Sequence, residues 1–304
     1  MWPFHRRKRA ATLVRSPEQE SGSRFNWQQD RKYLADAPYL LPKDLQEGSR
    51  LDFQHYVIRY ALHGNYAAPL DHPQSILDVG TGTGRWAREM AQFFPQANVI
   101  GVDVVQPTVD EQSDRTGYEL RPENYSYVTG SVLDGLPFGD RTFEYVHQRL
   151  LFLAIPADRW PAVARELARV TRPGGWVELV ESGLLTNAGP ETERLEGWGN
   201  ALGRGRNVDM RVTPEIGQFL HGAGLAPVEE RTFQIPLGRW GGRLGQMMAQ
   251  NIVAAFTAIR PAILGMQLAS AEEIDATLAA LPAEWEQRHS STPFYVTWGR
   301  RTQA

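Results

Sequence analysis

The run from Ile76 to Gly84 constrains the fold of this chain more than any other part of the sequence. It reads Ile-Leu-Asp-Val-Gly-Thr-Gly-Thr-Gly and leads directly into a segment with helical character. Glycines at a turn from strand to helix let the backbone approach a ligand closely, and the first turn of the helix offers free N–H groups. In open α/β sheets, ligands bind outside the carboxyl ends of the strands. The run therefore predicts a buried parallel strand followed by a ligand-binding turn.

The sequence around this run alternates between strand and helix. Apolar strands are predicted at residues 75–79, 98–103, 125–129, 142–147 and 176–181, with helices at 84–94 and 157–171. Later in the chain, helices are predicted at 214–223, 241–263 and 271–288, and strands at 228–235 and 293–299. Alternating strands and helices favour a mostly parallel sheet. We expect an α/β, doubly wound, Rossmann-like fold with a mostly parallel seven-stranded sheet, an antiparallel edge strand formed by a late hairpin, an N-terminal helical cap and a C-terminal helical insertion.

The chain divides into three parts by composition. Residues 1–23 are polar and predict a disordered tail, although the basic run from His5 to Arg9 would also suit a phosphate-contacting arm or a targeting signal. Residues 24–72 predict the cap, with an irregular aromatic segment at 25–42 and a helix at 49–62. Residues 73–304 predict the sheet domain, in which helices at about 240–290 would cover the ligand side.

Two carboxylates indicate which ligand the turn binds. Asp78 lies at the end of the first strand, where it can hold a cationic amino group that a nicotinamide dinucleotide does not have. Asp103 closes the second strand, where a carboxylate can accept both ribose hydroxyls. The spacing G-x-G-x-G also differs from the dinucleotide pattern G-x-G-x-x-G. An NAD-type oxidoreductase remains the alternative, since a glycine turn of this kind is shared with dinucleotide-binding domains.

With these residues, the stretch 75–181 resembles the class I S-adenosylmethionine-dependent methyltransferases. The resemblance implies that S-adenosyl-L-methionine is the cofactor. It implies that the methionine part is surrounded by Asp78, Gly80, Thr81, Gly82 and Gly84. It also places Asp103 on the ribose, Val104 against the adenine face, and Ser131 and Val132 beside the adenine. The family commonly has an acid where this chain has Ser131, so the contact to the adenine amino group would pass to a backbone carbonyl or to Asp134. The run Arg172-Pro173-Gly174-Gly175 resembles the family's turn before the fifth strand.

A narrower resemblance covers residues 25–185. Arg50-Leu51-Asp52-Phe53-Gln54-His55, Ala68-Pro69 and Val146-His147-Gln148-Arg149 are similar to methyltransferases related to fungal regulators of secondary metabolism. This resemblance implies a methyltransferase of small-molecule metabolism.

The residues after the fourth and fifth strands are the candidates for contact with an acceptor. His147 would act as a general base for a hydroxyl acceptor or merely line the cofactor. Gln148 would contact the cofactor or the acceptor, and Arg149 would bind an acidic substrate or pair with a carboxylate of the cap. Glu181 is as well suited to a structural role as to a functional one.

The cap and the cover offer two further surfaces. One face of the cap helix carries Asp52, His55, Tyr56 and Arg59, and would either be solvated or close over the cofactor. In the cover, an apolar group would line a substrate pocket or pack in the core, and its members are Trp240, Met247, Met248, Phe256 and Met266.

Composition excludes several classes of function. The chain has no cysteine, so disulfides, zinc–thiolate sites, iron–sulfur clusters and thiolate nucleophiles are absent. The net charge of −3 and the lack of an Asn/Asp-Pro-Pro-aromatic run argue against a nucleic-acid substrate. No stretch approaches a membrane span in this reading, and no secretory signal is recognised, so we expect a cytoplasmic protein with no membrane partner.

These observations predict an S-adenosylmethionine-dependent methyltransferase that acts on an oxygen or nitrogen of a small-molecule, specialised-metabolite acceptor, with no metal. A cofactor-binding regulatory protein without transfer activity would keep the same binding residues and is the main alternative.

Overall fold

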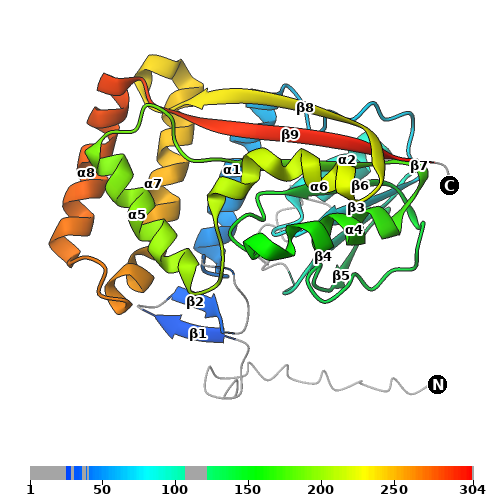
Figure 1. Cartoon of the computed structure of the whole chain (residues 1–304), viewed down its shortest axis with the longest axis horizontal. Helices are drawn as coiled ribbons and strands as arrows, with labels where there is room; N and C mark the ends of the chain where they lie inside the picture. Colours follow the sequence, from blue (N-terminus) through cyan, green and yellow to red (C-terminus); the bar gives the residue numbers. More distant parts are fainter. Residues whose placement is uncertain (1–24, 29–30, 36–38, 40, 107–121, 303–304) are drawn as a thin grey trace, which may run out of the picture.

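A computed structural model describes residues 25–28, 31–35, 39, 41–106 and 122–302 of the chain. The tail predicted at residues 1–23, with its basic run, lies outside the described residues. The described chain contains a small N-terminal hairpin, a seven-stranded sheet and helices on both faces of that sheet (Figure 1).

The large sheet has the strand order β5-β4-β3-β6-β7-β9-β8. Its parallel strands are β3 (Ser75–Val79), β4 (Asn98–Asp103), β5 (Tyr125–Thr129), β6 (Phe143–Arg149) and β7 (Thr171–Ser182). The long strand β9 (Ser291–Arg301) pairs antiparallel with β7 on one side and with the edge strand β8 (Leu225–Pro236) on the other. The predicted fold class is thus confirmed, including the antiparallel pairing at the edge. The turn Pro173-Gly174-Gly175 forms an irregularity within β7, where Gly174 has a φ of 80°.

The helices that cross between the strands end close to their predicted bounds. They are α2 (Arg85–Phe93), α4 (Trp160–Val170) after the 3-10 turn η2 (Ala157–Arg159), and α6 (Ile216–Gly222) after η3 (Met210–Glu215). Alternate residues of each strand point to opposite faces of the sheet. In β3 and β6, Ile76 and Tyr145 therefore join one apolar cluster, whereas Leu77 and Val146 join the other. Both faces are buried, as expected for a doubly wound sheet.

The N-terminal cap consists of the hairpin β1 (Phe25–Gln28) and β2 (Arg31–Leu34), followed by α1 (Leu45–Leu62). The prediction of an irregular segment at 25–42 was wrong in its first half, where the hairpin forms. Asp44 begins α1 by accepting a hydrogen bond from the Glu47 N–H, and its carboxylate also pairs with Arg31 at 2.6 Å. The same aspartate therefore caps the helix and ties it to the hairpin.

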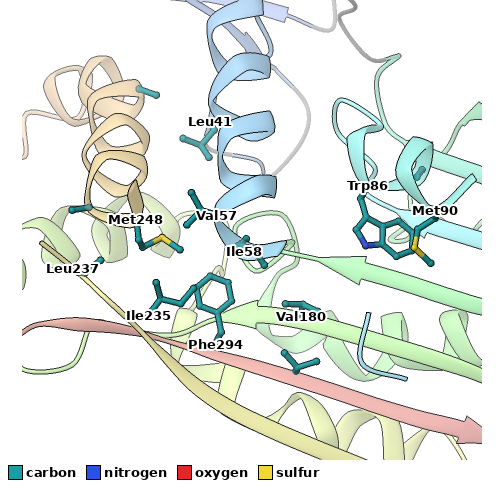
Figure 2. Close-up of a cluster of buried hydrophobic side chains, with 14 of the residues drawn as sticks. Leu41, Val57, Ile58, Trp86, Met90, Val180, Ile235, Leu237, Met248 and Phe294 are labelled. Atoms are coloured by element: carbon teal, nitrogen blue, oxygen red, sulfur yellow. The ribbon is translucent and has the colours of Figure 1, made fainter. Parts of the chain in front are cut away.

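The C-terminal cover is formed by α7 (Gly242–Gly265), which follows η4 (Arg239–Gly241), and α8 (Ala271–Arg288), both between β8 and β9. A further helix, α5 (Pro190–Arg204), was not predicted; it follows β7 and packs with α7 and α8 at one end of the molecule (Figure 1). Figure 2 shows how Met248 of α7, Val57 and Ile58 of α1, and Phe294 of β9 share one apolar cluster. Cap, cover and sheet therefore share a continuous core.

The segment Arg239–Gly265 is long and apolar enough to cross a membrane by length and composition, which the sequence reading did not anticipate. Its buried face packs against α1, and its exposed positions carry Gln246, Gln250 and Thr257. Core helices pass the same test of length and composition, so the helix is by itself weak evidence for a membrane. Its packing is that of a cover helix.

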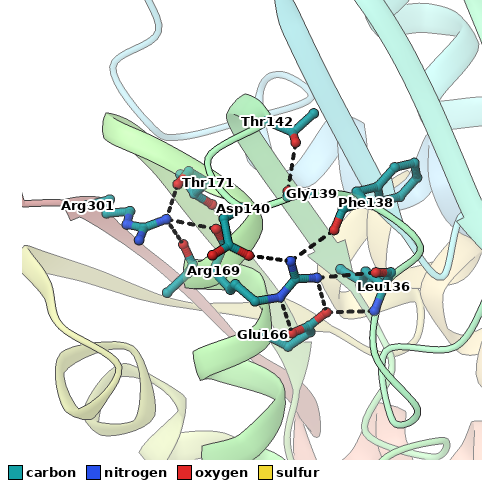
Figure 3. A network of polar contacts seen from close by, with 10 residues as sticks. Leu136, Phe138, Gly139, Asp140, Thr142, Glu166, Arg169, Thr171 and Arg301 are labelled. Atoms are coloured by element: carbon teal, nitrogen blue, oxygen red, sulfur yellow. Dashed lines mark hydrogen bonds and ion pairs between the residues drawn. The ribbon is translucent and has the colours of Figure 1, made fainter.

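A polar network fixes the loop between β5 and β6 (Figure 3). Arg169 of α4 pairs with Glu166 and Asp140, each at 2.7 Å, and donates to the carbonyl oxygens of Leu136 and Phe138. Glu166 in turn accepts the Leu136 N–H at 2.6 Å. Backbone groups of Leu136 and Phe138 thus attach the loop to α4, and this attachment also positions the loop residues that directly follow β5.

We expect Arg169→Ala to lower the free energy of unfolding by about 1–3 kcal/mol, because loop carbonyls and two carboxylates lose their donor. Urea denaturation measures this loss. Arg172→Ala is the matched control: its ion pair with Glu144 is largely solvated, with 49% of the Arg172 side chain exposed, so its loss should stay under about 1 kcal/mol. Equal losses in the two variants would contradict the role given to Arg169.

Candidate active site

A cavity of about 660 Å³ lies at the carboxyl ends of β3, β4 and β6, between the cap helix α1 and the cover helix α7. The glycine turn after β3, the end of β4 and the segment after β5 form one part of its wall. Residues of α1, α5 and α7 form the other part. This is the edge of an α/β sheet at which ligands bind.

The glycine turn has a backbone that only glycine adopts without strain. Gly80, Gly82 and Gly84 have φ angles of 70°, 58° and 77°. The N–H groups of Gly80 and Thr81 both donate to the Val102 carbonyl oxygen, at 2.8 and 3.0 Å, so the turn is attached to β4. A Cβ on Gly84 would lie 2.5 Å from the Tyr125 hydroxyl, so this position is closed to larger residues. The turn therefore presents bare backbone to the cavity.

Asp78 is buried at the end of β3 and is held from two sides. Thr81 Oγ1 donates to its Oδ2 at 2.6 Å, and His147 Nδ1 lies 2.8 Å from its Oδ1. The His147 ring stacks on Trp86 at 3.8 Å and is 1% exposed. Burial lowers the pKa of His147 below its usual value, against the opposing effect of Asp78. A neutral ring with its proton on Nδ1 fits this arrangement, since a carboxylate can only accept.

Asp103, at the end of β4, has one oxygen on the turn and one on the cap. Its Oδ2 accepts the Gly82 N–H at 2.9 Å, and its Oδ1 lies 3.4 Å from Lys43 Nζ. Val104 follows it, and Ser131 and Val132 extend the same wall after β5. The structure thus brings the residues predicted for the ribose and the adenine to one side of the cavity.

Two predicted cofactor residues do not line the cavity. Gln148 follows His147 on β6, and because side chains alternate along a strand it points to the opposite face of the sheet, where it is 0% exposed. Its position does not fit direct contact with a ligand. Gly84 lies behind the wall and begins α2. It shapes the turn without facing the cavity.

Arg149 does line the cavity, and its partner in the cap is a histidine rather than the predicted carboxylate. Its Nη2 lies 3.0 Å from His55 Nδ1, and His55 Nε2 lies 3.1 Å from Glu89 Oε2. A guanidinium only donates, so Nδ1 of His55 accepts and its ring proton points toward Glu89. Burial opposes ionisation of Glu89, but hydrogen bonds from His55 and Asn65 hold its pKa at about 2.

The predicted face of the cap helix, from Asp52 to Arg59, contacts the sheet domain through its first residue, Asp52. Asp52 accepts hydrogen bonds from Thr83 Oγ1 at 2.5 Å and Arg85 at 3.0 Å, so α1 is attached to the start of α2. Arg59 lies 3.2 Å from Glu89, and Tyr56 is 42% exposed. The face therefore contributes both domain contacts and a solvated edge.

Two buried glutamates of β7 shape the cavity indirectly. Glu181 accepts the N–H groups of Leu151 and Phe152, which lie in the cavity wall after β6. Glu178 accepts the N–H groups of Ala67 and Ala68, in the segment that leads from the cap to β3. Burial raises the pKa of Glu178 to about 7 and that of Glu181 to about 8. Sequence reasoning left Glu181 open and missed Glu178, although an acid inside an apolar strand signals a buried partner.

The apolar group predicted in the cover separates in the structure. Met248 and Phe256 line the cavity, and Met247 packs beside the core. Trp240 and Met266 are 40% and 54% exposed and lie away from the cavity wall. For these two residues the pocket prediction was wrong, because they stand at the two ends of α7 rather than on its buried face.

The sequence has clear relatives. Residues 76–175 match the methyltransferase domain family. Over 285 residues the chain is 30% identical to the N-methyltransferase sirN of Leptosphaeria maculans, covering 90% of this chain and 98% of that protein. It is 29% identical over 213 residues to the secondary metabolism regulator laeA of Monascus pilosus, covering 66% and 55% of the two chains.

The chain belongs to the class I S-adenosylmethionine-dependent methyltransferases. In fold it is similar to phosphoethanolamine N-methyltransferase 2 of Haemonchus contortus, solved in complex with S-adenosyl-L-methionine. The TM-score is 0.51 at 15% identity, over 84% of this chain and 52% of that one. Membership of this family replaces the oxidoreductase alternative. The resemblance read from the sequence is confirmed.

The cofactor of this methyltransferase is S-adenosyl-L-methionine, and the cavity suits it. The turn at Gly80 and Gly82 offers an approach for a ligand along the backbone, and Asp103 stands at the strand end where ribose hydroxyls are held. Arg149 adds a cation to the cavity wall that Asp78 also lines, so both signs of charge are present there.

We expect Asp103→Asn to weaken binding of S-adenosylhomocysteine by about 30-fold or more, because a charged acceptor becomes a neutral amide. Isothermal titration calorimetry measures the change. Asp71→Asn, an exposed aspartate outside the cavity, is the control and should bind as the wild type does. Unchanged binding in Asp103→Asn would remove Asp103 from the cofactor site.

We also expect Glu178 and Glu181 to contribute a decline in the stability of this methyltransferase as the pH rises from about 4.5 to about 8. Below about pH 6.5 the lowered pKa values of the buried His55 and His147 contribute an opposing rise, so the decline is clearest from pH 6.5 to pH 8. Glu178 and Glu181 have raised pKa values when folded, so the folded state binds more protons in this window and loses that advantage as they ionise. Glu181→Gln should flatten the decline, as measured by urea denaturation at pH 5, 6.5 and 8. The exposed Glu193→Gln should leave it unchanged. A slope in Glu181→Gln equal to that of the wild type would contradict this assignment.

Proposed function

We propose that this methyltransferase moves the methyl group of its cofactor to a nitrogen of a small, enclosed acceptor in specialised metabolism. The observation that carries this proposal is the cavity itself, which α1, α5 and α7 cover at the carboxyl edge of the sheet. Such a covered space suits a small molecule better than a protein or nucleic-acid strand. The likeness to sirN, named an N-methyltransferase, favours nitrogen over oxygen.

Methyl transfer from a sulfonium depends more on alignment of the acceptor with the methyl group than on acid–base catalysis by the protein. The bound cofactor supplies a methyl group on a positively charged sulfur, which is a good leaving group. The chain therefore has to hold the acceptor in line with that group and keep water out. The apolar residues Met248, Ile252 and Phe256 of α7 would exclude water from the acceptor side.

For the residues of the cavity we propose the following division of roles. Asp78 faces the amino group of the cofactor, and His147 keeps its carboxylate oriented through the 2.8 Å contact. His147 is less suited to act on an acceptor, since its Nε2 is fully buried. Asp103 holds the ribose, Val104, Ser131 and Val132 flank the adenine, and Gly80, Thr81 and Gly82 form the backbone cradle. Arg149 binds the carboxylate of the cofactor rather than an acidic substrate.

A regulatory protein without transfer activity is the second candidate. It is supported by the likeness to laeA, which is named a regulator of secondary metabolism. Both candidates share the cofactor cavity, and only turnover separates them. Action in the cytoplasm, without nucleic acid or membrane, stays a prediction.

The decisive experiment incubates the purified protein with S-adenosyl-L-methionine carrying a deuterated methyl group and a panel of small amines, amides and phenols. We expect a mass increase on nitrogen-containing members, located on nitrogen by fragmentation, and a strongly reduced increase with Asp103→Asn when the cofactor concentration is below that variant's dissociation constant. Transfer to phenol oxygen alone would correct the acceptor atom. Tight cofactor binding with no transfer to any member would favour the regulatory candidate.

A further inference from the structure

The helix α5 is held rigidly at its start and reaches the cavity along its middle. Pro190 occupies its first turn, and the Glu284 carboxylate of α8 accepts the N–H groups of Glu191 and Thr192 at 2.8 and 2.9 Å. Trp285 Nε1 donates to Thr192 Oγ1 at 2.8 Å. From this fixed start, α5 presents Glu196, Gly199 and Asn200 to the cavity wall.

Glu196 lines the cavity from α5 and carries a carboxylate without an ion-pair partner among the described residues. Its Oε1 accepts the N–H of Leu185, itself a cavity residue, at 2.7 Å. In the part of the chain that the structure describes, no second hydrogen bond and no ion pair of this carboxylate is found. Burial raises the pKa of Glu196 above its usual value, against the effect of the Leu185 N–H, and the nearby Glu193 adds to the rise. The carboxylate therefore stands in partly apolar surroundings without a cation.

The cations of the cavity wall are occupied elsewhere. Within the described ranges, Lys43 lies beside Asp103, Arg50 pairs with Glu47 at 2.5 Å, and Arg85 pairs with Asp52 at 3.0 Å. Arg149 is engaged by His55. The acids Asp78 and Asp103 also have donors of their own, and Asp134, which lines the cavity after β5, is solvent-exposed. Glu196 is thus a carboxylate that the surrounding protein leaves to a ligand.

The residues around Glu196 are apolar, which favours an acceptor with an apolar body next to its N–H group. Phe256 of α7 lies against α5, where a Cβ on Gly199 would be 3.7 Å from its ring. Leu185, Ile252 and Ala255 line the same cavity. A half-buried carboxylate among apolar groups costs free energy unless a donor reaches it, and a ligand N–H supplies one.

We propose that Glu196 is the acceptor-binding carboxylate of this methyltransferase, and that it accepts a hydrogen bond from an N–H of an apolar amine or amide. This proposal rests on the proposed function and names its substrate class. Carboxylic acids are disfavoured at the same place, because a second anion beside Glu196 is repelled. Glu196 could not be singled out from the sequence pattern, since α5 itself was not predicted.

The test uses the full chain saturated with S-adenosylhomocysteine and three probes of similar size: benzylamine, benzyl alcohol and phenylacetate. Ligand-observed NMR titrations give the affinity of each probe. We expect the wild type to prefer benzylamine to phenylacetate by about tenfold or more, as one charge-assisted hydrogen bond predicts. Glu196→Gln keeps an oxygen for the Leu185 N–H but loses the charge, so it should lose this preference and bind benzyl alcohol as the wild type does.

Glu193→Gln is the matched control, because it removes a glutamate charge from an exposed position of the same helix. It should retain the wild-type preference. S-adenosylhomocysteine affinity and the thermal midpoint of each variant show whether the fold and the cofactor site are intact.

The outcomes separate the two proposals. A wild type that binds neither charged probe, or shows no preference between them, overturns the role of Glu196, as does a preference that survives in Glu196→Gln. Selective amine binding through Glu196 without any methyl transfer would overturn the proposed function and leave the binding role in place. Methyl transfer to nitrogen at the same rate in the wild type and in Glu196→Gln would support the proposed function and overturn the binding role of Glu196.

Discussion

The attachment of the glycine turn to the end of β4 is the constraint on which the rest of the site depends. Gly80 and Thr81 donate to one carbonyl oxygen of Val102, and Gly82 donates to the Asp103 carboxylate. These bonds require left-handed backbone at Gly80 and Gly82, and they fix the distance between the ends of β3 and β4. Once the turn is fixed, its residues line the cavity without bulky side chains, α2 starts behind it, and Asp52 of the cap has Thr83 and Arg85 to bind.

Buried polar groups, rather than apolar contacts alone, connect the cap and the loops to this turn. Glu178 and Glu181 give their oxygens to backbone N–H groups of segments that would otherwise have no partner. The cost of burying an acid appears in their raised pKa values, and the benefit is a defined path for the chain around the cavity. Arg169 performs the corresponding task for the loop after β5, but near the surface and with its charge compensated (Figure 3).

The local sequence pattern predicted the strand bounds well in the first part of the sheet, where each strand is a short apolar run that ends at a turn. The strands β3, β4 and β5 have the bounds expected from their apolar runs, because a fully buried parallel strand has a distinctive composition. The same reasoning failed for α5, whose sequence mixes charged residues with several glycines and shows no clear apolar stripe. Its start is stabilised by Glu284 of α8, which lies far along the chain. Gln148 faces away from the cavity because side chains alternate along β6 and its neighbour His147 takes the cavity side.

The sequence by itself therefore determined the family and the cofactor, and it pointed to the carboxylates Asp78 and Asp103 at the ends of the first two strands, since these features depend on residues close together in the chain. Only the tertiary structure decided which polar groups share the cavity. Arg149 meets His55 of the cap, and Glu196 of α5 stands with Phe256 of α7, although these pairs are distant in the chain. Burial and pairing are set by which elements pack together, and that packing decides which charges are satisfied within the protein and which remain accessible to a ligand.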